Sequence, residues 1–258
     1  MVFDPYKFNV KLCLEESGYS VCLIDEVHDS KRADLLATCD TDSLIIEVKC
    51  KYDDKDLYEQ LKIADPLKII PYHVYIERKN SLSSIIEEAS MQIEESRYLS
   101  KDAFSVIWFH PNPKLGFFDS DEQIRMNLYG GQYAFVDGPD GKKWCMPCYY
   151  TTYTDFYRYT SIEAVALDIK EGVQLLTNPF SKRAENFKNS KLYNDFKSHS
   201  AIWTPELFAT NGEALCAKLP VDLKDPKAVC NSLEQHNPGY KIIRLNVGLQ
   251  SIGGMLKS

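Results

Sequence analysis

The sequence lacks several features that would assign it to particular classes of protein. The 258-residue sequence contains no run of about 18 apolar side chains, so no membrane-spanning helix is expected. The opening residues MVFDPYKFNV lack the basic and then apolar layout of a secretory signal, which favours a cytoplasmic protein. Acidic residues outnumber basic ones, 37 to 30, which gives a net charge of -7. Any contact with nucleic acid is therefore expected to be local rather than spread over a basic surface.

The cysteines do not form the spaced framework of a small disulfide-rich protein. There are eight, scattered through apparent strands, which favours reduced and mostly buried thiols. Cys145 and Cys148 make a single CMPC motif without a second pair at similar spacing. A structural zinc site needs four ligands, of which this motif provides two and to which His110 or His199 could contribute in space. Buried hairpin thiols are the preferred interpretation.

The composition is that of an ordinary globular protein, with 44% hydrophobic and 26% charged residues. Hydrophobic spacing predicts a helix over residues 4–17, ended by Gly18, and then three strands. In the first 111 residues, strands are expected at 19–27, 33–38, 43–50, 72–77 and 104–109, with a helix at 82–98. In the rest of the chain we expect a hairpin at 132–150, a strand at 164–169, a basic helix at 181–196, and a C-terminal helix and strand within 225–246. This order predicts an α/β domain over residues 1–111 and a mixed α+β region over 112–258.

Three charged residues interrupt the otherwise apolar stretch KRADLLATCDTDSLIIEVKCK, residues 31–51. Side chains alternate between the two faces of a strand, so Glu47 and Lys49 project to one side. If the two strands pair as a hairpin, Asp34 comes close to Glu47. The stretch therefore predicts a cluster of two carboxylates and one ammonium group.

Such a cluster is costly unless something compensates the charges. Mg²⁺ compensates them well, because it prefers oxygen ligands, takes one or two carboxylates, and keeps waters and substrate phosphate in its other positions. A neighbouring lysine can orient or deprotonate a water and stabilise charge on the phosphate. The three residues together favour hydrolysis of phosphodiester bonds.

The order of helix and strands, with AD opening one strand and IIEVK in the next, resembles the PD-(D/E)XK nuclease superfamily over residues 5–110. The resemblance implies a restriction-endonuclease-like core, a mixed β-sheet flanked by helices. It implies a nuclease that uses Mg²⁺ or Mn²⁺, favours DNA over RNA, and acts in genome defence or repair. Asp34, Glu47 and Lys49 would be catalytic, and Asp34, Glu47 and the carbonyl of Val48 would bind the metal.

Further residues enter through the same resemblance. Ala33 replaces the motif proline, and Lys7 stands near the position where many members carry a glutamate in the first helix. Glu15 and Glu16 are the acidic residues of that helix near its end, and either Gln60 or Gln92 matches an accessory glutamine.

The most basic local cluster contains Lys182, Arg183, Lys188 and Lys191. These residues either contact phosphates or form a solvated helix face. A second copy of the chain or a partner protein could supply further specificity.

Two other interpretations remain open at this point. A nuclease-like domain without catalysis would serve as a nucleic-acid-binding or scaffold module. Alternatively, the chain is an unrelated α/β protein in which Glu47 and Lys49 face water and Asp34 caps a strand.

Overall fold

The computed structural model describes residues 4–24, 32–52, 70–76, 80–112, 120–247 and 249–255. The chain divides into two compact units. Unit 1 comprises residues 1–51, 81–111 and 155–204, and unit 2 comprises residues 52–80, 112–154 and 205–258. Unit 1 differs from the expected domain over residues 1–111, because residues 52–80 belong to unit 2 and residues 155–204 belong to unit 1.

Unit 1 begins with helix α1 (Pro5–Glu16), whose ends follow directly from the sequence. The Asp4 side chain caps the helix by accepting a hydrogen bond from the backbone N–H of Tyr6 at 2.9 Å. Pro5 fits the first helical position because its missing N–H would have no partner there. Gly18 follows the helix with a φ of 83°, a conformation that glycine adopts without strain. The predicted helix over residues 4–17 is confirmed.

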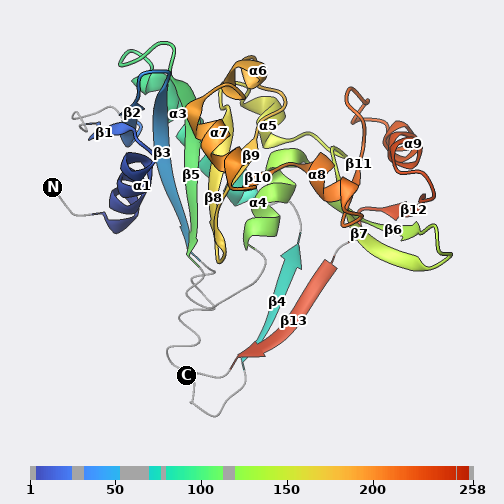
Figure 1. Cartoon of the computed structure of the whole chain (residues 1–258). Coiled ribbons are helices and arrows are strands. Elements are labelled where there is room, and N and C mark those ends of the chain that lie inside the picture. The colour runs from blue at the N-terminus through green and yellow to red at the C-terminus, as the bar shows by residue number, and fades with distance from the viewer. Residues whose placement is uncertain are drawn as a thin grey trace. The chain divides into compact units, whose positions relative to one another are not determined.

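The main structure of unit 1 is a mixed seven-stranded sheet (Figure 1). In sheet order its strands are β1 (Ser20–Leu23), β2 (Leu35–Thr38), β3 (Ser43–Tyr52), β5 (Phe104–Asn112), β8 (Ala164–Ile169), β9 (Gly172–Thr177) and β10 (Ile202–Trp203). The β1–β2, β2–β3 and β8–β9 pairs are antiparallel, whereas β5–β8 and β9–β10 are parallel.

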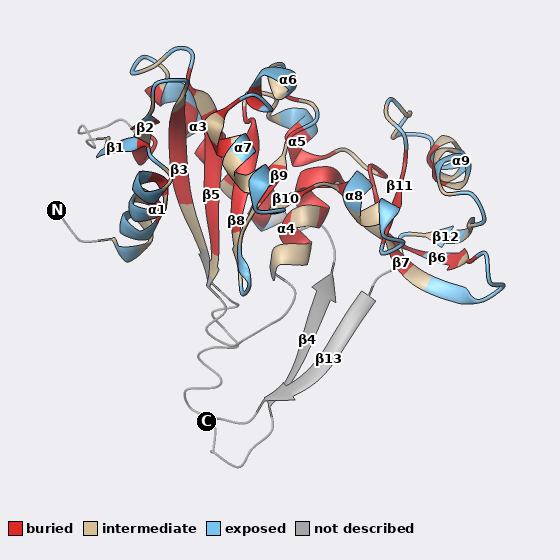
Figure 2. Ribbon diagram, in the orientation of Figure 1, coloured by how far each residue is buried: buried red, intermediate tan, exposed pale blue. Residues whose placement is uncertain are grey.

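Helices cover both faces of this sheet (Figure 1). On one face, α1 and α7 (Lys191–Ser198) contribute Val10, Leu14 and Leu192 to a core that includes Ile46 and Trp108. Strand alternation turns Ile45, Glu47 and Lys49 to the opposite face. That face is covered by α3 (Asn80–Ser96), which buries Leu82, Ile86, Ala89 and Ile93. Figure 2 shows the central strands β3, β5 and β8 buried between these layers.

Two short helices complete unit 1, α5 (Asp155–Arg158) and α6 (Ala184–Phe187). The basic segment 181–196, expected as one helix, forms α6 and α7 instead. Ser190 separates them because its side chain accepts a hydrogen bond from the N–H of Tyr193 and so caps a new helix.

Unit 2 contains a four-stranded sheet and a separate two-stranded ribbon. The sheet has the order β11 (Leu215–Cys216), β7 (Lys143–Tyr149), β6 (Gln132–Asp137) and β12 (Lys241–Leu245). The ribbon pairs β4 (Ile70–Ile76) with β13 (Leu249–Met255) in antiparallel register. Within the described residues of this unit the helices are α4 (Ser120–Tyr129), α8 (Pro205–Thr210) and α9 (Pro226–His236).

The structure confirms a mixed α/β protein with a large mixed sheet flanked by helices. One strand differs from its expected place: β4, expected to belong to the N-terminal core, lies in unit 2, because its partner is a strand about 180 residues further along the chain. Among the described residues, no helix is both long and apolar enough to cross a membrane.

Candidate functional site

The candidate site forms where strands β2 and β3 pair. Their register sets Leu35 opposite Ile46 and Thr38 opposite Ser43. The backbone N–H of Asp34 continues this ladder by donating to the carbonyl of Ile46 at 3.0 Å. Asp34 is thereby aligned with Glu47 across the hairpin, as the sequence predicts.

Both carboxylate oxygens of Asp34 have a partner, and its side chain is only 8% exposed. Oδ2 accepts a hydrogen bond from the backbone N–H of Val48 at 2.8 Å. Oδ1 contacts Nζ of Lys7, which reaches it from α1. The amide of Val48, whose carbonyl was expected to be a metal ligand, thus helps to fix Asp34 beside β3.

Lys49 is held by two side chains on the face covered by α3. Its Nζ lies 2.9 Å from Glu47 Oε1 and donates to Gln92 Oε1 at 2.6 Å. The Gln92 amide in turn donates from Nε2 to the carbonyl of Arg32 at 3.3 Å. Of the two glutamines considered, Gln92 is therefore at the site, and Gln60 lies outside the described residues.

The Glu47 carboxyl is the most perturbed acid of this cluster. Burial, followed by the adjacent Asp34 carboxylate, raises its pKa from 4.5 to about 8, although Lys49 acts in the opposite direction. Its side chain is 3% exposed, and Oε2 is buried without a hydrogen-bond partner. An unpartnered buried carboxylate oxygen costs free energy, so this atom marks a place where a ligand would be stabilising.

Helix α1 supplies a cation to the site rather than an acid. Burial lowers the pKa of Lys7, but the hydrogen bond and charge of Asp34 and the charge of Glu47 outweigh it, and the pKa is raised. Glu15 and Glu16 are not brought to the site, because they lie about 12 Å further along the helix at 1.5 Å per residue. Both are exposed, and Glu15 pairs with Lys11 at 3.6 Å.

Asp34 and Glu47 are the residues of the cluster that could hold a metal ion. Within the described part of the chain, no three His, Cys, Asp or Glu side chains gather as a metal-binding group. Asp34 and Glu47 offer two carboxylates, which is the number that Mg²⁺ commonly takes from a protein. The unpartnered Oε2 of Glu47 gives such an ion one ligand atom without displacing any protein contact.

A second polar pair, His110 and Asp168, was not predicted from the sequence. His110 Nδ1 contacts Asp168 Oδ2, while its Nε2 is buried without a hydrogen-bond partner. The ring lies 5.2 Å from that of Tyr6 in α1. Burial and the carboxylates of Asp4, Asp168 and Asp34 raise the pKa of the Cys50 thiol to about 11, which places these acids around one thiol. Both residues lie near the ends of neighbouring buried strands, and this position is the sequence feature from which the pair could have been predicted.

The basic cluster expected to contact nucleic acid is largely paired within the protein. Three of its four residues contact acids: Arg183 with Glu163 at 2.9 Å, Lys188 with Glu185 at 2.7 Å and Lys191 with Asp195 at 2.8 Å. Lys182 is exposed. These pairings are internal to the protein, and contact of the four residues with nucleic acid stays a prediction.

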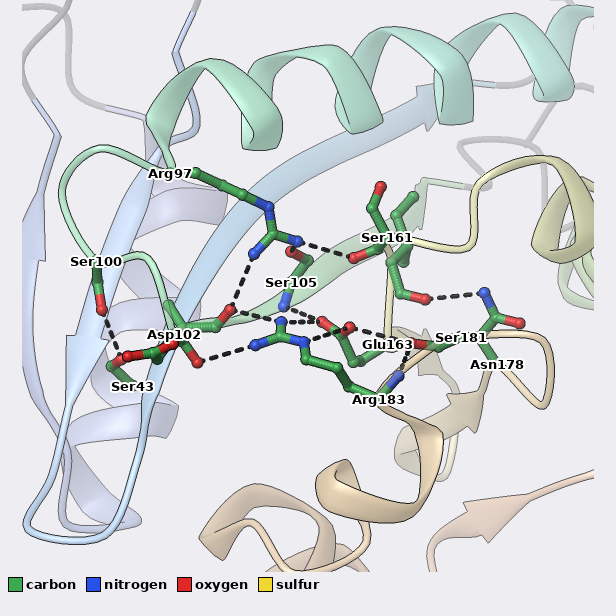
Figure 3. A network of polar contacts seen from close by, with 12 residues as sticks. Ser43, Arg97, Ser100, Asp102, Ser105, Ser161, Glu163, Asn178, Ser181 and Arg183 are labelled. Carbon is green, nitrogen blue, oxygen red and sulfur yellow. Dashed lines mark hydrogen bonds and ion pairs between the residues drawn. The ribbon is translucent and has the colours of Figure 1, made fainter.

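Arg183 belongs to a network that joins separate elements of unit 1 (Figure 3). It donates from Nε and Nη2 to the two oxygens of Glu163, which is 2% exposed. Glu163 Oε2 also accepts the backbone N–H of Ser105 at 2.6 Å, and Oε1 accepts the hydroxyl of Ser181 at 3.0 Å. Glu163 thus links the starts of β5 and β8 to the segment before α6, which is a structural role.

Cys145 and Cys148 lie on strand β7, three residues apart, so their side chains project to opposite faces. Cys148 is buried, and burial raises the pKa values of both thiols. These features are those of protonated thiols in a packed hairpin.

Raised pH is expected to destabilise the metal-free protein through Glu47. Because the folded pKa of about 8 exceeds the ordinary 4.5, the folded state holds a proton that the unfolded chain has lost between these values. The free energy of unfolding then falls as pH rises across this window, by up to about 1.4 kcal/mol per pH unit. Urea unfolding in EDTA between pH 5 and 8 measures this slope. Glu47→Gln should flatten it, and parallel curves for the two proteins would contradict the assignment.

Comparison with known proteins adds no relative: no family model matches the chain, and no curated protein or solved structure matches it.

Proposed function

We propose that unit 1 is a restriction-endonuclease-like domain that hydrolyses phosphodiester bonds of nucleic acid, DNA in preference to RNA, with Mg²⁺ or Mn²⁺. The observation that carries the proposal is the convergence of Asp34, Glu47 and Lys49 in one buried cluster where Glu47 Oε2 has no protein partner. The helix, hairpin and flanked mixed sheet around the cluster are consistent with that fold.

The electrostatics of the cluster support this chemistry over a purely structural role. A structural ion pair would be expected to use the carboxylate oxygens that it buries. Here Glu47 keeps one buried oxygen unpartnered, and the neighbouring Asp34 raises its pKa further. Perturbed titratable groups that face each other in this way are typical of functional sites.

The residues divide the proposed work between them. Asp34 and Glu47 would hold the cation, which when bound polarises the phosphate and lowers the pKa of a bound water. Lys49 is positioned by Glu47 and Gln92, which occupy two of its three N–H donors. Its third donor is available to a water or a phosphate oxygen, so that Lys49 orients the water as a P–O bond forms and stabilises charge on phosphate as the opposite bond breaks.

The test is a cleavage assay with the full chain on supercoiled plasmid, single-stranded DNA and RNA. Cleavage is expected with Mg²⁺ or Mn²⁺ and not with EDTA, and DNA should be cut faster than RNA. The matched variant is Asp34→Asn, which keeps an oxygen for the Val48 N–H but removes the charge. Cleavage that persists in EDTA or at the wild-type rate in Asp34→Asn would overturn the proposed site.

One observation favours a second candidate function. The Lys7 ammonium already neutralises Asp34, so the cluster is satisfied in part without a cation. A module that binds nucleic acid without cutting it is consistent with that arrangement. In the same assay, binding of DNA with no cleavage under any metal would support this candidate instead.

A further inference from the structure

The first helix delivers a lysine directly onto a carboxylate of the candidate site. Lys7 lies one turn before Val10, which is buried against the sheet together with Leu14. The cap at Asp4 and these apolar contacts fix the helix over the hairpin, and the Lys7 side chain is only 28% exposed. Its ammonium is therefore a built part of the cluster rather than a mobile surface charge.

The contacts of the two carboxylates leave one oxygen atom unpartnered. Asp34 Oδ2 accepts from the Val48 amide and Oδ1 contacts Lys7, while Glu47 Oε1 contacts Lys49. Glu47 Oε2 is the remaining oxygen, and it is buried. Glu47 and Asp34 would together hold a first cation, with the unpartnered Glu47 oxygen available to it. A second cation would have to displace the Lys7 ammonium from Asp34.

The balance of charges in the cluster also indicates a single divalent cation. When Glu47 has released its proton, as it must to bind a cation, two carboxylates and two ammonium groups cancel and the cluster carries no net charge before metal or substrate binds. One divalent cation adds two positive charges, which match one phosphodiester and one hydroxide. A second divalent cation would leave two positive charges unbalanced in a buried place, where uncompensated charge is costly.

We propose that Lys7 limits the candidate site to a single divalent cation by holding its ammonium where a second cation would contact Asp34. The inference rests on the proposed metal-dependent function and specifies its metal stoichiometry. It makes Lys7 a permanent, covalently attached cation of the site. The residue is then expected to control how many ions bind and how tightly they bind, apart from any effect on turnover.

The test measures binding of Mn²⁺ alone to the full chain by isothermal titration calorimetry and by electron paramagnetic resonance of free Mn²⁺. Wild type should bind one ion. Lys7→Glu, which replaces the ammonium by a carboxylate beside Asp34, should bind two. Lys7→Met removes the charge and keeps the length, and should bind the first ion about tenfold more tightly, because the ammonium no longer repels that ion at close range.

Lys11→Met is the matched control on the same helix. Lys11 contacts Glu15 rather than the site, so its replacement should leave both the number of ions and the affinity unchanged. Thermal unfolding of each variant checks that the helix still packs. If Lys7→Glu does not fold, the affinity change in Lys7→Met decides the question.

The outcomes separate this inference from the function on which it rests. Two ions in wild type, one ion in a folded Lys7→Glu, or an unchanged affinity in Lys7→Met would each overturn the role of Lys7 alone. No Mn²⁺ binding to wild type, or equal binding by Asp34→Asn, would overturn the metal site itself and the inference with it.

Discussion

Replacement of Lys49 by alanine is expected to slow metal-dependent phosphodiester cleavage by about 10³-fold, the middle of the range for loss of a positioned proton-transfer group. The ammonium is fixed by Glu47 at 2.9 Å and by Gln92 at 2.6 Å, whereas the other ammonium of the cluster, Lys7, is paired with Asp34. Its loss also leaves Glu47 without its cation. Single-turnover cleavage of an end-labelled duplex with saturating Mg²⁺ measures the chemical step directly.

A control and a second variant make this result specific. Lys170→Ala removes an exposed lysine from the end of β8 and should keep the wild-type rate. The variant Lys49→Ala should still bind DNA, because its defect lies in the chemical step. A rate within tenfold of wild type would show that Lys49 is not catalytic. A loss of folding, seen as a lowered melting temperature, would show that its role is structural.

Replacement of Glu163 by alanine is expected to destabilise the protein by about 3–5 kcal/mol, the cost of removing one partner of a buried ion pair. The carboxylate receives two donors from Arg183, one backbone N–H from Ser105 and one hydroxyl from Ser181 (Figure 3). Alanine would leave the guanidinium without its counter-charge and the Ser105 amide without its acceptor. Urea unfolding followed by tryptophan fluorescence measures the loss, and Trp108 in the core of unit 1 is a suitable reporter.

The matched control for this change is Glu185→Ala. Glu185 also pairs with a cation, Lys188, but its side chain is 84% exposed. Exposed ion pairs of this kind contribute little to stability, so we expect the free energy of unfolding to change by no more than about 0.5 kcal/mol. Equal effects of the two substitutions would show that the Glu163 network does not stabilise the sheet.

The hairpin of the candidate site could be predicted because its information is local. The turn-prone CDTD segment joins two strands with period-two alternation, so register follows from the pattern and aligns Asp34 with Glu47. The N-terminal helix was also predictable, because Asp4 and Pro5 start it and Gly18 ends it.

The remaining features depend on contacts between distant parts of the chain. In the sequence, Gln60 and Gln92 match the accessory glutamine equally well. Only the packing of α3 on the sheet brings Gln92 to Lys49. The return of residues 155–204 to unit 1 has no local signal either, since its strands are ordinary apolar runs. The sequence shows Arg183 only as part of a basic cluster, because its partner Glu163 is 20 residues away in sequence. The spacing of apolar residues predicts which face of a helix or strand is buried. It does not predict which distant residues pair, because tertiary structure decides that.

The split of unit 1 into separate chain segments has a consequence for folding during synthesis. Strand β5 lies between β3 and β8, but β8 begins at Ala164, roughly 50 residues after β5 ends. At roughly 5–20 residues per second, the ribosome needs about 3–10 s to make that interval. During this time an apolar strand, destined for the middle of a sheet, has an unpaired edge that can associate with other chains. The nascent protein is therefore expected to need protection from aggregation until residues of the second half arrive.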